Sequence, residues 1–397
     1  MNDFSSFPTL GILGGGQLAR MTAIAAFQLG VRVHIMERFP NSPAGSIAQK
    51  EVVGDPSDHE LLQSFAAECG VVTLESEFIN EGDLAVVEEA GGVLYPSSRS
   101  VGKIQDKLTQ KQTVEEAGIP VAPFRAVSTP DEAATFGEEF GYPFVLKSRR
   151  GGYDGYGNAT IRSREEIVDG WEKITGGALR NALYCEAFVH FTKELALMVT
   201  RGVSGEIALY PVVETVQKNH ICHTVTAPAR VSEEVAAKAR NYAQQAIEAI
   251  EGVGIFGVEL FVTADEQVLI NELAPRPHNS GHYTIEGCIT SQFENHIRAV
   301  MGWPLGDTSL RAPGVAMVNI LGREDGSGAV ENYRDVLSHP GLHLHIYGKQ
   351  SSRKGRKMGH ITALAESPEE AVRMAEEGEK RLLFASAANQ RIPTNGR

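Results

Sequence analysis

The pattern that most restricts the fold lies within the first thirty residues, where an apolar run passes through glycines into a helix. In PTLGILGGGQLARMTAIAAFQLG (8–30), the residues before Gly14 fit a buried strand. Leu18, Met21 and Ala25 then recur at helical spacing, and Gly30 is a natural C-terminal stop. A strand that turns directly into a helix predicts a βαβ unit, and hence a parallel sheet with helices beside it.

The pattern of alternating strands and helices continues over roughly the first hundred residues and then changes. VRVHIME (31–37), VVTLES (71–76) and VLYP (93–96) fit further strands, and 106–118 fits an amphipathic helix. From about residue 140, strand pairs dominate, with a helix at 232–250, a hairpin turning at 264–266 and a last helix at 367–383. These features predict an α/β and α+β chain of three domains: 1–98 (Rossmann-like), 99–310, and a small α+β domain at 311–397.

Composition excludes several classes of protein. The net charge of −13 argues against broad nucleic-acid binding, and no apolar run reaches the length of a membrane helix. The N-terminus lacks the basic region of a signal peptide, and the four cysteines are widely spaced without a C-x-x-C pair. We therefore expect a cytoplasmic metabolic enzyme with reduced thiols, and enzymes of this size are often homodimers.

The first glycine motif leaves two functions open. Gly14 to Ala19 satisfy G-x-G-x-x-A between a strand and a helix, and Glu37 lies about 20 residues on. This pattern is typical of an NAD(P)-dependent dehydrogenase. A helix N-terminus binds any phosphate, however, including that of a nucleoside monophosphate.

Two carboxylates within apolar strands favour ATP over NAD(P). Glu259 lies in FGVELFV, and Asn271 and Glu272 lie in LINELAP on the partner strand of the predicted hairpin. Buried carboxylates require compensating charge, which could come from Arg or Lys pairs or from a metal ion. Mg²⁺ takes one or two protein carboxylates together with phosphate oxygens, and a dehydrogenase has no use for such a site.

Three other stretches are rich in groups that could bind anions. APRPHNSGH (274–282) carries Arg276, His278, Asn279 and His282, which fit either a polar surface turn or a site for a small oxyanion. KSRRGGYDGYGN (147–158) is too rich in glycine for an ordinary turn, and its lysine precedes the glycines, so it is not a P-loop. YGKQSSRKGRKMGH (347–360) concentrates positive charge in an acidic chain.

With these residues in place, the sequence resembles the ATP-grasp ligases. Within them it is similar to the 5-(carboxyamino)imidazole ribonucleotide synthase family of purine biosynthesis. The similarity covers nearly the whole chain. It is carried by GILGGGQLARM, IQDKLTQK, GGYDGYGN, INELAPRPHNSGH, ITSQFENHIRAV and GRKMGH. It implies an ATP-grasp domain at 99–310, whose glycine-rich flap spans 150–158, between the Rossmann-like domain and the C-terminal domain.

The resemblance also implies roles for individual residues. Mg²⁺ would be held by Glu259 and Glu272, and bicarbonate and carboxyphosphate by Arg276, His278 and Asn279. The aminoimidazole ribonucleotide would contact Gln17, Leu18, Glu75, Tyr153, Asp154, Lys349 and Arg356. ATP would be bound by Lys107, Lys147, Gly152, Tyr153, Asp154, Gly155, Tyr156, Gly157, Asn158, Glu186, Ala187, Phe188, Val189, Glu194, Gln217, Asn271 and Glu272.

The implied reaction is ATP-dependent carboxylation of aminoimidazole ribonucleotide by bicarbonate, with Asp154 as a catalytic residue that orients the amine or takes its proton. The glycine-rich flap would seal the site while carboxyphosphate exists. Two positions depart from the family pattern: Tyr156 stands where relatives often carry Arg or Lys, and TLESEF replaces the usual TYEFEN around Glu75 and Glu77. The alternatives are the formate-dependent glycinamide ribonucleotide transformylase, within the same fold, and the NAD(P)-dependent dehydrogenase.

Overall fold

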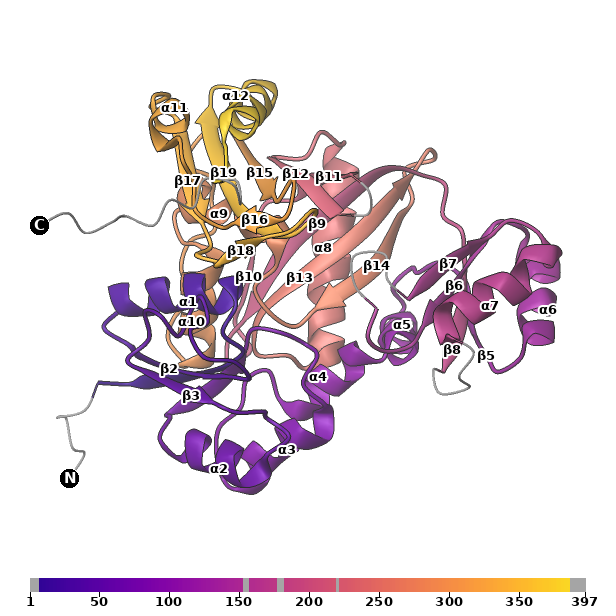
Figure 1. The fold of residues 1–397 in the computed structure, drawn as a ribbon. Helices are drawn as coiled ribbons and strands as arrows, with labels where there is room; N and C mark the ends of the chain where they lie inside the picture. Colours follow the sequence, from indigo (N-terminus) through magenta and orange to yellow (C-terminus); the bar gives the residue numbers. More distant parts are fainter. Residues whose placement is uncertain (1–6, 153–156, 177–181, 219–220, 386–397) are drawn as a thin grey trace, which may run out of the picture.

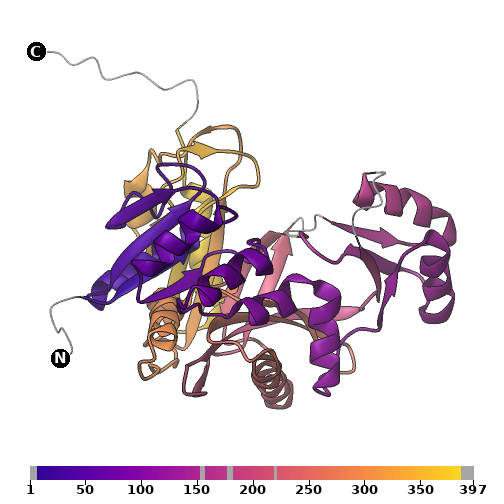
Figure 2. The same ribbon diagram turned by 90° about the horizontal axis from the view of Figure 1, so that it is seen from below.

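The structure is a computed structural model that describes residues 7–152, 157–176, 182–218 and 221–385. These residues form a parallel sheet near the N-terminus, a small antiparallel lobe, and one large sheet that includes most of the C-terminal strands (Figure 1). Seen from below, the small lobe projects to one side, away from the N-terminal and C-terminal parts (Figure 2).

The N-terminal sheet is parallel, with the order β3-β2-β1-β4, as the sequence predicts. Its strands are β1 (Thr9–Leu13), β2 (Arg32–Glu37), β3 (Lys50–Val53) and β4 (Val71–Leu74), and its helices are α1 (Gln17–Gln28), α2 (His59–Ala67) and α3 (Glu81–Glu89). The edge strand β3 is not evident in the sequence, because it is short, charged and only partly buried. The strand predicted at 93–96 makes only a single bridge, between Val72 and Leu94.

Two helices lead from this sheet into the small lobe: α4 (Ser98–Gln105) and α5 (Lys107–Glu116). The lobe contains β5 (Phe124–Val127), α6 (Pro130–Phe140), β6 (Phe144–Ser148), β7 (Asn158–Ile161), η1 (Arg164–Glu166), α7 (Ile167–Thr175) and β8 (Leu183–Ala187). Its sheet has the order β5-β8-β6-β7 and is antiparallel throughout. Asp106 caps α5 by accepting hydrogen bonds from two backbone N–H groups of the first turn. This cap fixes the start of the helix at Lys107.

The large sheet has the order β14-β13-β9-β11-β12-β15-β19-β17, with β10 paired to β9. Its first strands are β9 (Phe191–Arg201), β10 (Ile207–Leu209), β11 (Val213–Lys218), β12 (Ile221–Ala227), β13 (Gly254–Thr263) and β14 (Val268–Ala274). The hairpin of β13 and β14 turns as predicted, with Glu266 at φ 58°. Helix α8 (Glu233–Ile250) packs its apolar face on these strands and forms a core with them.

The chain returns to the N-terminal part before it completes this sheet, through η2 (Asn279–Gly281), α9 (Thr284–Gly287) and α10 (Gln292–Val300). Helix α10 contributes Phe293, Ile297 and Val300 to the same core as α1. This shared core fixes the N-terminal sheet against the large sheet.

Most of the C-terminal strands extend the large sheet, since β15 pairs with β12, while β16 and β18 pair only with each other. The remaining elements are β15 (Gly314–Leu321), β16 (Gly326–Ser327), α11 (Tyr333–Leu337), β17 (Leu342–Ile346), β18 (Ser351–Ser352), β19 (Lys357–Ala365) and α12 (Pro368–Arg381). Helix α12 gives these strands a core of their own. The division at 310/311 stays a prediction. Within the described ranges, every helix is too short or too polar to span a lipid bilayer.

Candidate active site

The two glutamates predicted to hold a metal ion lie opposite each other. Glu259 of β13 and Glu272 of β14 are directly paired in the hairpin register. Glu194 of β9 pairs with Phe261, two residues beyond Glu259, so it projects from the same face of the sheet. The pKa of Glu259 is raised to about 8, mainly by burial and to a smaller extent by the negative charges of Glu272 and Glu194. Three carboxylates on one face therefore leave negative charge that calls for a cation.

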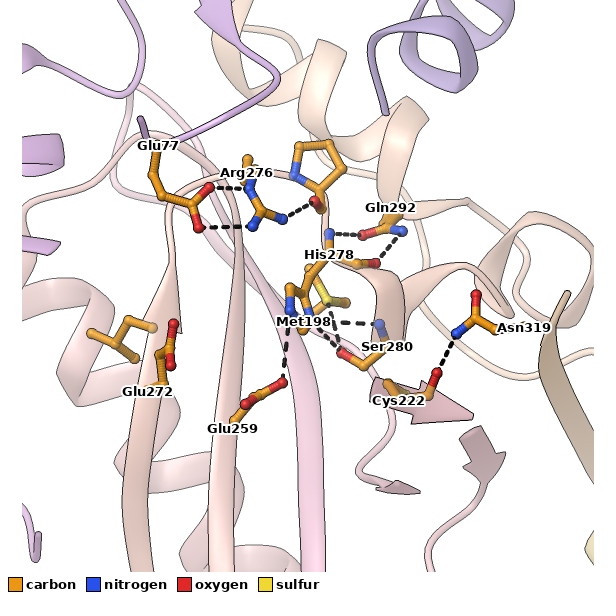
Figure 3. Close-up of polar contacts among 12 residues, drawn as sticks. Glu77, Met198, Cys222, Glu259, Glu272, Arg276, His278, Ser280, Gln292 and Asn319 are labelled. Carbon is orange, nitrogen blue, oxygen red and sulfur yellow. Dashed lines mark hydrogen bonds and ion pairs between the residues drawn. The ribbon is translucent and has the colours of Figure 1, made fainter. Parts of the chain in front are cut away.

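Pairing with Arg or Lys side chains compensates only part of the charge of these carboxylates. Lys107 Nζ lies 2.5 Å from Glu272 Oε1. His278 Nε2 lies 3.7 Å from Glu259 Oε1 (Figure 3). Burial lowers the pKa of His278 to about 3, with a smaller effect from Arg276, so this histidine adds no positive charge at neutral pH. Neither carboxylate is paired with an arginine in the part of the chain that the structure describes.

The donor set fits Mg²⁺ better than a metal held by protein alone. In the described ranges, no group of three or more His, Cys, Asp or Glu side chains is arranged to hold a metal ion. Mg²⁺ does not need such a group, because it takes one or two carboxylates and completes its shell with water and phosphate oxygens. The cross-strand pair of Glu259 and Glu272 meets that requirement.

A polar pocket next to this pair brings many of the predicted ATP-binding residues together. It is lined by Lys107, Gln110, Lys111, Lys147, Ser148, Gly152, Asn158, Tyr184, Asn271 and Glu272. The lining comes from α5, from β6 to β8 of the small lobe and from β14, so the pocket lies between the lobe and the large sheet. Gln110, Lys111, Ser148 and Tyr184 were not predicted. Lys111 follows Lys107 by one helical turn, and that spacing could have identified it.

Glu186 of β8 joins two lysines of this pocket. Lys147 Nζ lies 3.0 Å and Lys111 Nζ 3.3 Å from the same oxygen, Glu186 Oε2. Burial alone would raise the pKa of Glu186, but the two lysines outweigh it and hold the pKa below its usual value. Burial lowers the pKa of Lys111, against the effect of Glu186. The resemblance implies that Glu186 to Val189 contact ATP, and the structure adds that the Glu186 side chain positions Lys147.

The other predicted ATP-binding residues do not line this pocket. Ala187 ends β8, and Phe188 and Val189 follow it, with Phe188 exposed. Gln217 lies on β11 beside a register shift, and its buried Oε1 has no partner among the described residues. Gly157 has φ 78°, a conformation that favours glycine, directly before β7. Tyr153, Asp154, Gly155 and Tyr156 lie outside the described residues.

The predicted oxyanion site is only partly formed by the residues expected there. Asn279 has a buried Nδ2 without a partner in the described part of the chain, which is a donor available to an anion. Arg276 instead binds Glu77 through two parallel hydrogen bonds, one of them from Nη2 to Oε1 at 2.8 Å. His282 is buried, with Nδ1 3.0 Å from Gln292 Nε2, so its place in the oxyanion-binding segment was predicted wrongly.

The glycine motif at the start of α1 is occupied by the protein's own carboxylates. Gly15 N donates to Glu37 Oε2 at 2.7 Å, while Gly16 N and Leu18 N donate to Glu75. Glu37 is thus bound to the glycine turn itself, where a dinucleotide would place its pyrophosphate. The Leu18 side chain is buried, so only its backbone faces Glu75, and Gln17 begins α1. This arrangement argues against the dehydrogenase alternative.

Gly16 tests this arrangement directly. A Cβ at Gly16 would lie 2.2 Å from Glu75 Oε1, so Gly16→Ala is expected to displace Glu75 and to destabilise the fold by about 1–3 kcal/mol. Gly82→Ala in α3 is the matched control, because its nearest neighbour would lie 3.6 Å away and alanine favours helix. Thermal unfolding of both variants measures the difference. Equal midpoints would contradict the close contact between Glu75 and the glycine turn.

The basic segment near the C-terminus begins beside the N-terminal part, because Tyr347 packs in the same core as α1. Lys349 follows it by two residues. Its Nζ donates to Lys357 O at 2.7 Å, and burial lowers its pKa to about 8, with a further effect from Arg356. The charge of Glu75 raises the same pKa and so acts in the opposite direction. Arg356 is held by Ser351 O at 2.7 Å.

Comparison with known proteins agrees with this geometry. Family models match the chain over residues 7–105 (ribonucleotide synthetase preATP-grasp domain), 112–293 (ATP-grasp domain) and 315–374 (phosphoribosylaminoimidazole carboxylase C-terminal domain). The N5-carboxyaminoimidazole ribonucleotide synthase of Synechococcus elongatus is 40% identical over 89% of this chain and 88% of its own length. That of Bacillus subtilis is 39% identical over 91% and 92%.

The chain belongs to the N5-carboxyaminoimidazole ribonucleotide synthase family. The resemblance and the ATP-grasp fold with its N-terminal and C-terminal domains are thereby confirmed, and the dehydrogenase alternative is wrong. The phosphoribosylaminoimidazole carboxylase of Schizosaccharomyces pombe is 42% identical over 92% of this chain. The chain spans only 66% of that relative's length.

Two solved structures of this family show the same architecture. A synthetase from Thermotoga maritima has a TM-score of 0.85 at 40% identity, covering 96% of this chain and 100% of that one. A synthase from Aspergillus clavatus, in complex with ADP and 5-aminoimidazole ribonucleotide, has a TM-score of 0.85 at 36% identity, covering 94% and 99%.

Proposed function

We propose that this chain is an ATP-dependent carbon–nitrogen ligase that carboxylates 5-aminoimidazole ribonucleotide with bicarbonate, giving N5-carboxyaminoimidazole ribonucleotide, ADP and phosphate. The observation that carries the proposal is the cross-strand pair of Glu259 and Glu272 beside a pocket that contains Lys107 and Lys147. Carboxylates next to lysines are suited to a nucleoside triphosphate with its divalent cation. The names of the family relatives and the ligands of the Aspergillus clavatus complex supply the substrate.

Glu259 and Glu272 would hold Mg²⁺, and the bound ion would neutralise charge on the β- and γ-phosphate oxygens. Lys147, fixed by Glu186, and Lys107 would place positive charge on the phosphates from the small lobe and from α5. Lys107 would leave Glu272 to do so. In this arrangement catalysis consists mainly of positioning and electrostatic stabilisation.

The reaction balances with one proton released. A bicarbonate oxygen forms a bond to the γ-phosphorus of ATP while the bond from that phosphorus to ADP breaks. The exocyclic amine then forms a bond to the carboxyl carbon, phosphate leaves, and the amine loses a proton. Asn279, whose Nδ2 has no partner among the described residues, and Arg276, three residues before it, would bind the oxyanion. The resemblance assigns the amine proton to Asp154, and that role stays a prediction.

The decisive measurement is ADP release with bicarbonate, with and without aminoimidazole ribonucleotide, together with detection of the carboxylated product. We expect turnover to depend on both substrates and to stop when EDTA removes divalent cations. Stimulation by formate with glycinamide ribonucleotide would favour the transformylase alternative instead. The homodimer, the cytoplasmic location and the absence of nucleic-acid and membrane partners stay predictions from the sequence.

A further inference from the structure

Arg276 is held at the junction between the N-terminal sheet and the large sheet. It follows β14 by two residues, and its partner Glu77 follows β4 by three. Arg276 donates from Nε and Nη2 to the two oxygens of Glu77, in the parallel geometry that is specific to arginine (Figure 3). Only 18% of the Arg276 side chain and 13% of the Glu77 side chain are exposed.

The remaining contacts decide which edge of the guanidinium is available. Arginine has five N–H donors. Two go to Glu77, and Nη1 donates to Pro277 O at 3.2 Å, so two donors on the terminal nitrogens remain without a partner among the described residues. The residue after Pro277 is His278, which contacts Glu259. Arg276 thus belongs to the same short segment as the other residues predicted to bind the oxyanion, His278 and Asn279.

Glu77 is itself fixed, so the orientation of Arg276 does not depend on Arg276 alone. Gln105, at the end of α4, donates from Nε2 to Glu77 O at 2.8 Å and also to Ile79 O. Two residues earlier on the same segment, Glu75 binds the backbone at the start of α1. The segment after β4 therefore carries two carboxylates with different partners. Glu75 lies at the start of α1, where the ribonucleotide is predicted to bind, and Glu77 binds Arg276.

We propose that Glu77 is a positioning residue for the carboxylation reaction: it grips one edge of Arg276 so that the two remaining donors face the bicarbonate and the carboxyphosphate made from it. This inference rests on the proposed function. A buried ion pair contributes little net stability compared with apolar residues, so orientation of the guanidinium is the effect that this pair supplies. Lysine could not replace Arg276, because it has no second edge to present.

The test is bicarbonate kinetics of Glu77→Gln, with ADP release and carboxylated product measured at saturating ATP and aminoimidazole ribonucleotide. Glutamine keeps the shape but cannot accept two charge-assisted hydrogen bonds. We expect kcat/KM for bicarbonate to fall about 100-fold, as for a misplaced catalytic group, with KM for ATP unchanged within about twofold. Glu77→Asp, which keeps the charge, should recover part of the loss.

A double variant separates positioning from an independent role. If Glu77 acts through Arg276, Glu77→Gln combined with Arg276→Lys should be no slower than Arg276→Lys alone. Asp55→Asn is the control, because it removes an exposed ion pair with Arg38 (2.8 Å) in the same domain. Thermal melting of each variant monitors folding, and Glu77→Asp decides the question if Glu77→Gln does not fold.

The inference is overturned if Glu77→Gln leaves the bicarbonate kinetics unchanged, if ATP and bicarbonate parameters decline together, or if the two losses multiply in the double variant. Absence of product from the unaltered protein, under conditions where it binds ATP, would instead refute the proposed function. The two failures are therefore distinguishable from the first measurement.

Discussion

Replacing Glu259 by glutamine is expected to reduce ATP-dependent turnover about 1,000-fold, because a ligand of a cation that offsets phosphoryl charge supplies several kcal/mol. The same result is expected for Glu272→Gln, since the two carboxylates are register partners. The free energy of unfolding of Glu259→Gln should be unchanged or increased. Burial and the charge of Glu272 raise the pKa of Glu259, so its charged form is unfavourable in the fold without a cation. The measurement is steady-state ADP release across a magnesium titration, beside thermal unfolding without nucleotide.

The matched control is Glu248→Gln on α8, an exposed glutamate whose contact is with Gln244 one helical turn away. It makes the same chemical change far from the pocket and should leave turnover within about twofold. If Glu259→Gln kept full activity at ordinary magnesium concentration, the cation site would lie elsewhere and the proposed function would lose the observation that carries it.

The sequence predicted those parts of the site that depend on local patterns. Glu259 and Glu272 could be placed on partner strands of one hairpin because two apolar runs and a polar turn define it. Their direct pairing could not be predicted, because a register shift between Glu259 and Leu260 brings Glu272 opposite Glu259. The lysines, the glycines and the stretch from 274 to 282 were found for the same reason, as residue types concentrated within one short segment.

Contacts between distant segments could not be predicted in that way. Arg276 and Glu77 are 199 positions apart, and nothing local to either indicates that they bind each other. His282 was placed in the site because it ends a polar segment, yet the packing of α10 turns it toward Gln292. The sheet that continues from β12 into β15 was missed for a similar reason, since residues 228 to 313 separate the two strands.

Glu186, which pairs with two lysines of the pocket, is expected to be the most costly carboxylate of the site to neutralise. Glu186→Gln leaves Lys111 and Lys147 without their shared carboxylate, and Lys111 is almost fully buried. Breaking a buried ion pair by removing one partner costs about 3–5 kcal/mol, and we expect a loss of that size in the free energy of unfolding near neutral pH. Urea unfolding monitored by circular dichroism measures it.

The pH dependence of that loss gives a second check with a definite sign. The pKa of Glu186 is lower in the folded chain than the ordinary glutamate value of 4.5, because the two lysines outweigh the effect of burial. Its contribution is therefore complete above the unfolded pKa and is lost as the pH falls through the folded pKa. The stability difference between the unaltered chain and Glu186→Gln should be constant near neutrality and should shrink below about pH 4.5.

Two controls decide whether the loss arises from the unpaired lysines. Lys111→Met removes the more buried lysine but keeps the pair between Lys147 and Glu186, so it should cost clearly less than Glu186→Gln. Glu139→Gln breaks an exposed pair with Arg125 in the same lobe and should change stability by about 0.5 kcal/mol or less. If all three variants were equally stable, the carboxylate would not hold the lysines together. The site would then need another reason for Lys147 to face the nucleotide pocket.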